Sequence, residues 1–140
     1  MVDRDVVFAK IGIIKRCLKR ISLVTALDPN RLDDIDRQDI FVLNLQRAVQ
    51  AAIDLAAHIV ASEGFGVPQD MKEHFRFLRD NTIIDHDLCE KMERMIGFRN
   101  IAVHEYQEIN LDILRKILVS NLKDLEVFYT AIVKHFHLSD

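Results

Sequence analysis

Apolar residues recur at steps of three and four along most of this chain, and residues that form turns are scarce. A spacing near 3.6 residues places apolar side chains on one face of an α-helix. With four Gly and two Pro in 140 residues, the chain can make few turns, so its helices must be long. The pattern predicts helices over residues 3–26, 36–62, 68–79, 85–102 and 110–136.

The expected helix ends coincide with capping and helix-breaking residues. Asp3 and Asp85 are placed to cap helix starts, and Asp28-Pro29-Asn30 ends the first helix. The clearest loop is Gly64-Phe65-Gly66-Val67-Pro68, whose proline suits the first turn of the third helix. The sequence carries no strand alternation, Gly-rich phosphate loop or internal repeat. We therefore expect an all-α fold, an antiparallel bundle of four to five helices forming a single domain over residues 1–140.

The last predicted helix carries a heptad-like apolar stripe. Its members are Leu111, Leu114, Leu118, Leu122, Leu125, Tyr129, Ile132 and Phe136. Such a stripe needs a partner, which is either another helix of the same chain or a second subunit.

Composition excludes several classes of protein. The 19 Lys and Arg residues against 22 Asp and Glu give a net charge of −3, which fits neither a basic nucleic-acid arm nor an acidic tail. Cys17 and Cys89 lie far apart, so we expect buried small side chains rather than a disulfide scaffold. With no leader segment and no apolar run near the roughly 18 residues of a membrane span, we expect a soluble, cytoplasmic protein with no membrane partner.

Helical bundles often hold metals, but the ligand spacings are missing. Neither Glu-x-x-His nor His-Glu-x-x-His occurs, and the nearest pair is Asp54 with His58, one helical turn apart. A pair of this kind is more typical of a surface hydrogen bond or ion pair. We expect neither a metal nor a cofactor, which disfavours a metalloenzyme bundle.

The segment from Arg99 to Tyr106 carries the most chemistry. Arginine offers a planar fork of donors to phosphate oxygens, histidine exchanges protons near neutrality, and tyrosine can hydrogen-bond a phosphate or stack on a base. On a continuous helix Arg99 and His104 would lie about 140° apart. If the helix ends near Val103, however, Arg99, His104 and Tyr106 could meet at one spot. Structural capping and loop hydrogen bonds are the alternative interpretation.

The Arg-x4-His-x-Tyr pattern, near the end of the penultimate helix of a small all-α chain, resembles the HEPN ribonucleases. More narrowly, it is similar to the HepT-like toxins encoded beside a minimal nucleotidyltransferase antitoxin. Residues 44–60 resemble the second helix of that family and residues 95–100 its fourth, with Asn100 at a commonly polar position.

The resemblance implies a metal-independent endoribonuclease toxin of a type VII-like toxin–antitoxin pair. It implies a homodimer with both motif copies facing one cleft, and RNA products ending in a 2′,3′-cyclic phosphate. His104 would be the acid or base, Arg99 would hold the scissile phosphate, and Asn100 and Tyr106 would shape the site. The nucleotidyltransferase antitoxin would silence the toxin by attaching AMP to Tyr106.

Residues 3–20 hold six basic side chains against two acidic ones, although the whole chain is mildly acidic. Lys15, Arg16, Lys19 and Arg20 are therefore candidate RNA-binding residues, with a merely solvated face or an acidic partner surface as alternatives. A second function class stays open, namely a non-catalytic helical module that binds nucleotide or docks a nucleotidyltransferase.

Overall fold

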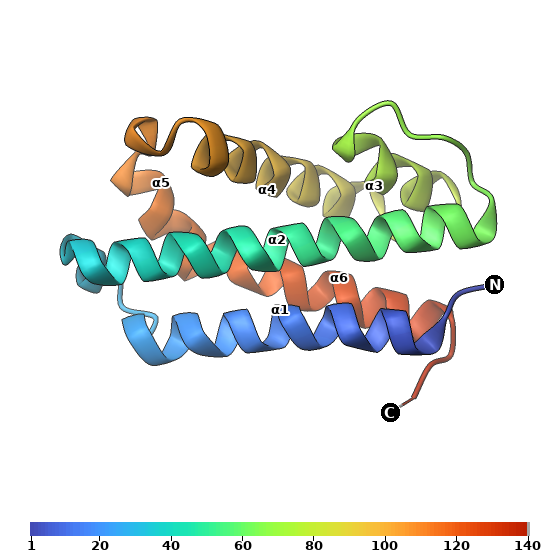
Figure 1. The fold of residues 1–140 in the computed structure, drawn as a ribbon, viewed down its shortest axis with the longest axis horizontal. Helices are drawn as coiled ribbons and strands as arrows, with labels where there is room; N and C mark the ends of the chain where they lie inside the picture. Colours follow the sequence, from blue (N-terminus) through green and yellow to red (C-terminus); the bar gives the residue numbers. More distant parts are fainter. Residues whose placement is uncertain (140) are drawn as a thin grey trace.

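The computed structural model describes residues 1–139, and all the secondary-structure elements in that range are helical. The elements in chain order are α1 (Arg4–Thr25), η1 (Pro29–Asp33), α2 (Ile35–Glu63), α3 (Met71–Asp80), α4 (His86–His104), η2 (Tyr106–Glu108), α5 (Leu111–Lys116), the π-helical η3 (Ile117–Asn121) and α6 (Leu122–His135). Figure 1 shows α1 and α2 side by side, with α3 and α4 along one flank and α6 behind them. The predicted all-α helical bundle is confirmed.

Short polar side chains start the helices, as the sequence indicates. The carboxylates of Asp3 and Asp85 accept hydrogen bonds from backbone N–H groups in the first turns of α1 and α4. Asp34 caps α2 in the same way. Each cap satisfies a backbone donor that has no partner within its helix.

The start of α3 differs from the prediction. Pro68 lies in the loop rather than in the first helical turn, and α3 begins at Met71. Asp70 supplies the cap, because its side chain accepts a hydrogen bond from the backbone N–H of Glu73 at 2.9 Å. The cap, rather than the proline, decides where this helix begins.

The predicted last helix, 110–136, is divided. Asn110 caps the short α5, and five π-helical residues of η3 connect it to α6. A π-helical segment widens the turn locally and interrupts the regular spacing of side chains. Leu114, Leu118, Leu125 and Ile132 of the apolar stripe are nevertheless buried within this chain. The intramolecular interpretation of the stripe is therefore correct for this part of it.

One apolar core joins the helices. The most extensive helix contact is between α1 and α2, and α6 contacts α1, α2 and α4. Phe75 of α3 and Phe128 of α6 are fully buried and meet edge to face, with ring centroids 5.3 Å apart. Cys17 and Cys89 are buried free thiols, as expected. Burial raises the pKa of both cysteine thiols.

The expectation that no stretch approaches the composition of a membrane span has to be corrected for α2. Among the described residues, α2 is the one helix long and apolar enough by length and composition to cross a membrane. The most apolar 18-residue window of α2 has a mean hydropathy of 1.2, and 61% of it is buried inside the bundle. A helix buried in a protein core passes the same test, and α2 packs against helices on several sides.

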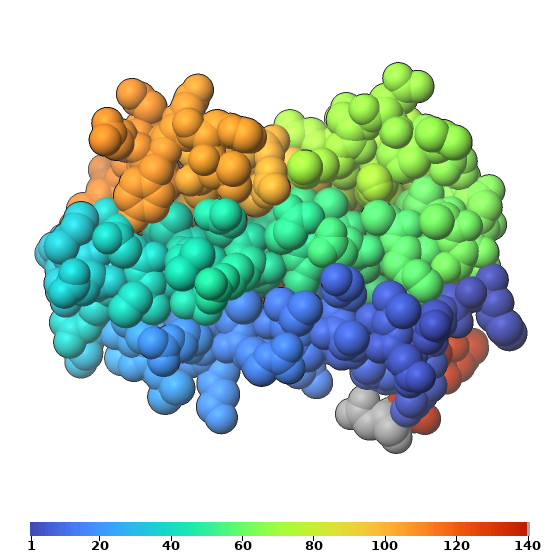
Figure 2. Space-filling view, in the orientation of Figure 1, coloured from blue at the N-terminus to red at the C-terminus, as the bar shows by residue number. Residues whose placement is uncertain are grey.

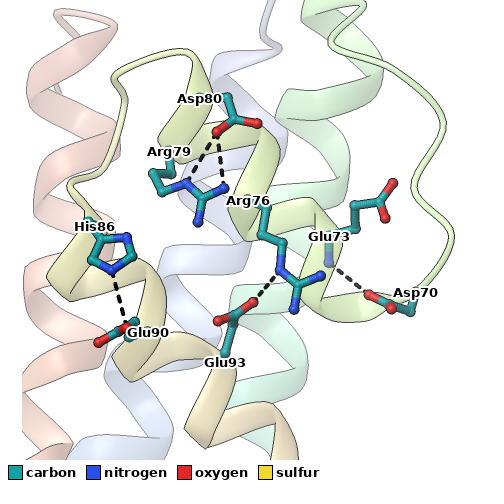
Figure 3. Close-up of polar contacts among 8 residues, drawn as sticks. All are labelled: Asp70, Glu73, Arg76, Arg79, Asp80, His86, Glu90 and Glu93. Atoms are coloured by element: carbon teal, nitrogen blue, oxygen red, sulfur yellow. Dashed lines mark hydrogen bonds and ion pairs between the residues drawn. The ribbon is translucent and has the colours of Figure 1, made fainter.

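The end of α2 and a bond between α3 and α4 lead the chain from one layer of the bundle to the next. Gly64 ends α2 in the left-handed conformation, with φ of 66°, which glycine adopts without steric cost. Figure 3 shows Arg76 of α3 and Glu93 of α4 pointing toward each other. The Arg76 Nε donates to Glu93 Oε1 at 2.5 Å, which joins the two helices.

The two ends of the described chain lie together. The amino group of Met1 donates to the carbonyl oxygen of Ser62 at 3.0 Å, near the end of α2. The Arg4 Nε donates to the carbonyl oxygen of Ser139 at 2.9 Å. Figure 1 places both ends at the opposite end of the bundle from the turn between α4 and α5.

Candidate functional site

The end of α4 and the turn after it place His104 and Tyr106 of the predicted motif at the surface. The helix ends at His104, and Glu105 leaves the helical conformation with φ of −139°. Residues 106–108 form the short η2, and Asn110 then caps α5. Residues 104–108 are all exposed, so the turn is open to a ligand.

Arg99 is half-buried on α4 and interacts with its neighbour in sequence. One terminal guanidinium nitrogen, Nη1, donates to the Asn100 side-chain oxygen at 3.0 Å. The Nε of Arg99 is buried and has no hydrogen-bond partner. No carboxylate among residues 1–139 forms an ion pair with Arg99. The guanidinium charge is therefore not neutralised within the described chain.

His104 is exposed as the last residue of α4. Because the helix continues through His104 instead of ending near Val103, Arg99 and His104 leave it about 140° apart. Asn100 lies between them on the helix surface. Within the described residues, no hydrogen bond joins Arg99 to His104. Within residues 1–139, no hydrogen bond brings Arg99, His104 and Tyr106 together, as an earlier helix end would allow.

Tyr106 reaches back to a different helix. Its hydroxyl donates a hydrogen bond to Asp39 of α2. Burial, together with the bond and charge of Asp39, raises the pKa of Tyr106 to about 12. The phenol is therefore protonated at neutral pH, although the residue is 41% exposed. Figure 2 shows the end of α4 and the following turn, in orange, lying against the first half of α2, in teal.

Sequence reasoning did not select Asp39 as a functional residue. Its contact with Tyr106 joins residues 67 positions apart, and no local spacing signals such a pair. Gln38 and Val42, from the same part of α2, line a small hollow with Tyr106, Gln107 and Ile109. The first two turns of α2 are therefore part of this site.

An apolar pocket of about 420 Å³ opens beside the motif, between α4 and the segment from α5 to η3. Phe98, Ile101, Ile109, Ile113 and Ile117 contribute its apolar walls. Ile101 and Ile113 are 41% and 49% exposed, which leaves apolar surface uncovered next to the motif.

The residues considered for metal binding have other partners. Asp54 accepts hydrogen bonds from Gln50 at 2.9 Å and from Lys10 at 3.4 Å. The Nε2 of His58 accepts the backbone N–H of Asp3 at 3.0 Å. In residues 1–139, no three His, Cys, Asp or Glu side chains gather in a way that could hold a metal ion.

The four basic candidates of α1 divide between two faces. Lys15 and Lys19 line a groove with α6 and η3, where the Lys15 ammonium lies 5.5 Å from the centroid of the Tyr129 ring. Arg16 and Arg20 line a separate groove against α2, together with Arg47. The four candidate residues therefore line two separate grooves.

Known proteins resemble this chain over most of its length. The family model described as Ribonuclease HepT-like matches residues 14–132. The mRNA nuclease HepT of Shewanella oneidensis is 41% identical over 128 residues, which cover 91% of this chain and 96% of that protein.

Solved structures share the fold over nearly the whole chain. The structure of the tri-AMPylated Shewanella oneidensis HEPN toxin in complex with MNT antitoxin has a TM-score of 0.88 at 41% identity, covering 93% of this chain and 98% of that one. A crystal structure of a toxin-antitoxin with AMP-PNP has the same TM-score at 40% identity, with coverage of 93% and 98%. The chain belongs to the HepT-like ribonuclease family, a family of the HEPN type.

Proposed function

We propose that this chain is a metal-independent endoribonuclease that acts as the toxin of a toxin–antitoxin pair in the cytoplasm. The observation that carries the proposal is the Arg-x4-His-x-Tyr motif, with Arg99 half-buried and His104 and Tyr106 exposed, on a chain that matches an mRNA nuclease over 96% of that nuclease's length. Arg99 has no carboxylate partner among residues 1–139, which leaves its charge available for a phosphate.

The proposed reaction is the one that the resemblance to the HEPN ribonucleases implies. The 2′-oxygen of a ribose attacks the adjacent phosphorus while a base removes its proton, and the bond to the 5′-oxygen breaks. That oxygen takes a proton from an acid, and the other product ends in a 2′,3′-cyclic phosphate. His104 supplies the acid or base, and Arg99 stabilises the charge that develops on the phosphorus oxygens. Asn100 orients the Arg99 guanidinium through the hydrogen bond that it accepts.

A second copy of the chain completes the site in this proposal. Arg99 and His104 leave α4 about 140° apart, so one chain does not direct both side chains at one phosphate. The apolar pocket beside the motif, with its exposed Ile101 and Ile113, offers the surface that a two-fold partner would cover. The two motif copies would then face a common cleft.

Regulation by a nucleotidyltransferase antitoxin is the third part of the proposal. Tyr106 is 41% exposed next to His104, and a related HEPN toxin is tri-AMPylated in complex with an MNT antitoxin. Transfer of AMP from ATP forms a bond from the tyrosine oxygen to the α-phosphorus, releases pyrophosphate and displaces the phenol proton. The attached phosphate would repel RNA phosphate beside the catalytic histidine.

The decisive experiment is cleavage of RNA in EDTA by the wild type and by His104→Ala. We expect cleavage that resists EDTA, is lost in the variant and leaves a 2′,3′-cyclic phosphate. Equal cleavage by both proteins, or complete inhibition by EDTA, would overturn the proposal. A non-catalytic module predicts no cleavage by either protein.

The modification has its own test. The intact mass of the chain, co-expressed with a nucleotidyltransferase encoded beside it, should increase by whole AMP units. The increase should be absent in Tyr106→Phe and present in Tyr129→Phe, which serves as the control. AMP attached equally to both variants would overturn the assignment of Tyr106.

A further inference from the structure

A groove of about 370 Å³ runs between α1 and α2, separate from the turn after α4. Its lining residues are Ile13, Arg16, Cys17, Arg20, Ile40, Leu43, Asn44 and Arg47. All three arginines are exposed, and no Asp or Glu belongs to the lining. Leu43 is 43% exposed, so the walls between the arginines are partly apolar.

The charge of this groove is not neutralised by its surroundings. Arg16, Arg20 and Arg47 form no ion pair with any carboxylate in the range 1–139. Arg16 and Arg47 lie close enough to Cys17 that their charges oppose the rise in its pKa that burial causes. The other basic groove differs, because Glu126 lies in its lining and Lys15 lies over the Tyr129 ring.

The spacing of the three arginines suits an extended polyanion. Arg16 and Arg20 are one turn apart on α1, with Cα atoms separated by about 6 Å along the helix. Arg47 faces them from α2 across the groove. Guanidinium groups form planar, paired hydrogen bonds to phosphate oxygens and lose their water more readily than ammonium groups.

The groove and the turn after α4 both adjoin α2. Asp39, which holds Tyr106, lies eight residues before Arg47, or about 12 Å along the helix. Eight residues also rotate the helix surface by about 80°, so both side chains lie on the same half of α2. A strand that passes the turn after α4 can therefore reach the arginines without crossing the bundle.

We propose that the groove of Arg16, Arg20 and Arg47 binds the phosphates of single-stranded RNA that extends from the cleavage site. This inference rests on the proposed ribonuclease function and adds the path of the substrate. Ile13, Ile40 and Leu43 supply apolar surface for the nucleobases between phosphate contacts. The arginines position RNA and do not take part in the chemical step.

Binding can be measured without cleavage. A fluorescent 2′-O-methyl RNA lacks the attacking 2′-hydroxyl, so its anisotropy with the full chain reports affinity alone. We compare the wild type with Arg47→Gln and Arg16→Gln/Arg20→Gln at several salt concentrations. For single strands the slope of log affinity against log salt should decrease by about 0.7 for each arginine removed. The dissociation constant should rise roughly tenfold in the double variant.

Two other variants make the test selective. Lys123→Gln/Lys134→Gln removes two exposed charges from α6 and should leave the salt slope almost unchanged. Lys15→Gln/Lys19→Gln removes the same charge from the separate groove between α1 and α6. A larger effect of the Lys15 and Lys19 variant than of the Arg16 and Arg20 variant would overturn the proposal. Circular dichroism should show the same helix content in all these proteins.

Other results separate this inference from the proposed function. If the arginine variants bind RNA normally but lose a co-expressed antitoxin, the groove is a protein-docking surface and the inference is wrong. If the wild type does not bind the 2′-O-methyl RNA, the inference is also wrong. If the wild type binds that RNA through the arginines but cleaves no RNA in EDTA, the nuclease proposal fails and the binding assignment stands.

Discussion

The hydroxyl of Tyr106 donates a hydrogen bond to the carboxylate of Asp39, which ties the turn after α4 to the beginning of α2. This contact holds a surface tyrosine against an acidic partner from a distant part of the sequence. The proposed modification site is thereby fixed relative to α2, the same helix that carries Arg47 of the arginine groove.

The phenol of Tyr106 should ionise at a higher pH than that of an ordinary tyrosine. Burial and Asp39 raise its pKa to about 12, against an ordinary value of about 10. In a Tyr129→Phe background, the absorbance of phenolate should therefore rise near pH 12, and adding Asp39→Ala should lower that midpoint. An unchanged midpoint in the Asp39 variant would contradict the role of this carboxylate.

The raised pKa of Tyr106 should make the stability of the fold depend on pH. The folded state favours the protonated phenol, so this contribution is complete below about pH 10 and is lost as the pH rises toward 12. The free energy of unfolding should accordingly fall more steeply above pH 10 than it does in Tyr106→Phe.

Removing the Tyr106 hydroxyl should cost little but measurable stability. Tyr106→Phe deletes one hydrogen bond to a charged acceptor at a partly exposed site, which predicts a loss of about 0.5–1 kcal/mol in the free energy of unfolding. Tyr129→Phe is the matched control, because the ring beneath Lys15 is retained. Equal losses in urea unfolding would show that the bond to Asp39 contributes nothing specific.

Two glycine substitutions should have opposite effects. Gly64 ends α2 at φ of 66°, and a Cβ there would meet no atom within 4 Å. Gly64→Ala should therefore destabilise the fold by about 1 kcal/mol through backbone strain alone. Gly97 lies inside α4, where an added Cβ also meets nothing, so Gly97→Ala should stabilise by about 0.5–1 kcal/mol. Thermal unfolding of both variants checks the signs.

The contact between Phe75 and Phe128 should be important for the core. Phe128→Ala removes a fully buried ring from an edge-to-face pair, and we expect a loss of about 3–5 kcal/mol. Val127→Ala, at a neighbouring side chain that is 51% exposed, should change stability by less than about 0.5 kcal/mol. Denaturant unfolding of both proteins gives the two losses in the free energy of unfolding. Equal losses would mean that any substitution in α6 destabilises the fold, whatever the burial of the side chain.

If the proposed dimer forms through the apolar pocket, a charge placed there should halve the mass of the particle in solution without changing the fold. Ile113→Lys places a charge on the apolar pocket beside the motif and should convert the dimer to a monomer in sedimentation experiments. Val127→Lys alters a side chain of similar exposure outside that pocket and should leave the dimer intact. Dimers of both variants would exclude this pocket from the interface, and monomeric wild type would exclude the dimer itself.

Much of the fold could be predicted because it depends on local chemistry. Asp3 and Asp85 start helices through their own neighbouring N–H groups, and Gly64 ends one through its backbone freedom. The π-helical segment could not be predicted, because the packing of α5 and α6 determines it. The start of α3 could not be predicted either, because the cap at Asp70 places it after Pro68.

The residues of the candidate site, too, could be predicted only in part. Arg99, His104 and Tyr106 could be selected from their chemistry and spacing, and Asn100 from the family resemblance; the structure places Asn100, His104 and Tyr106 at the surface. Asp39 and Arg47 could not be selected, because their positions beside Tyr106 and Arg16 depend on how α2 packs against the rest of the chain. The split of the basic α1 residues between two grooves also required the neighbouring helices.

The two ends of the described chain lie near one end of α2, whereas the turn with His104 lies near the other end of that helix. Twenty-nine residues of helix span about 43 Å. An affinity tag or a fluorophore attached at Met1 would therefore stand well clear of the turn. The protein can be immobilised through that end while its reactive end stays free for RNA and for a modifying enzyme.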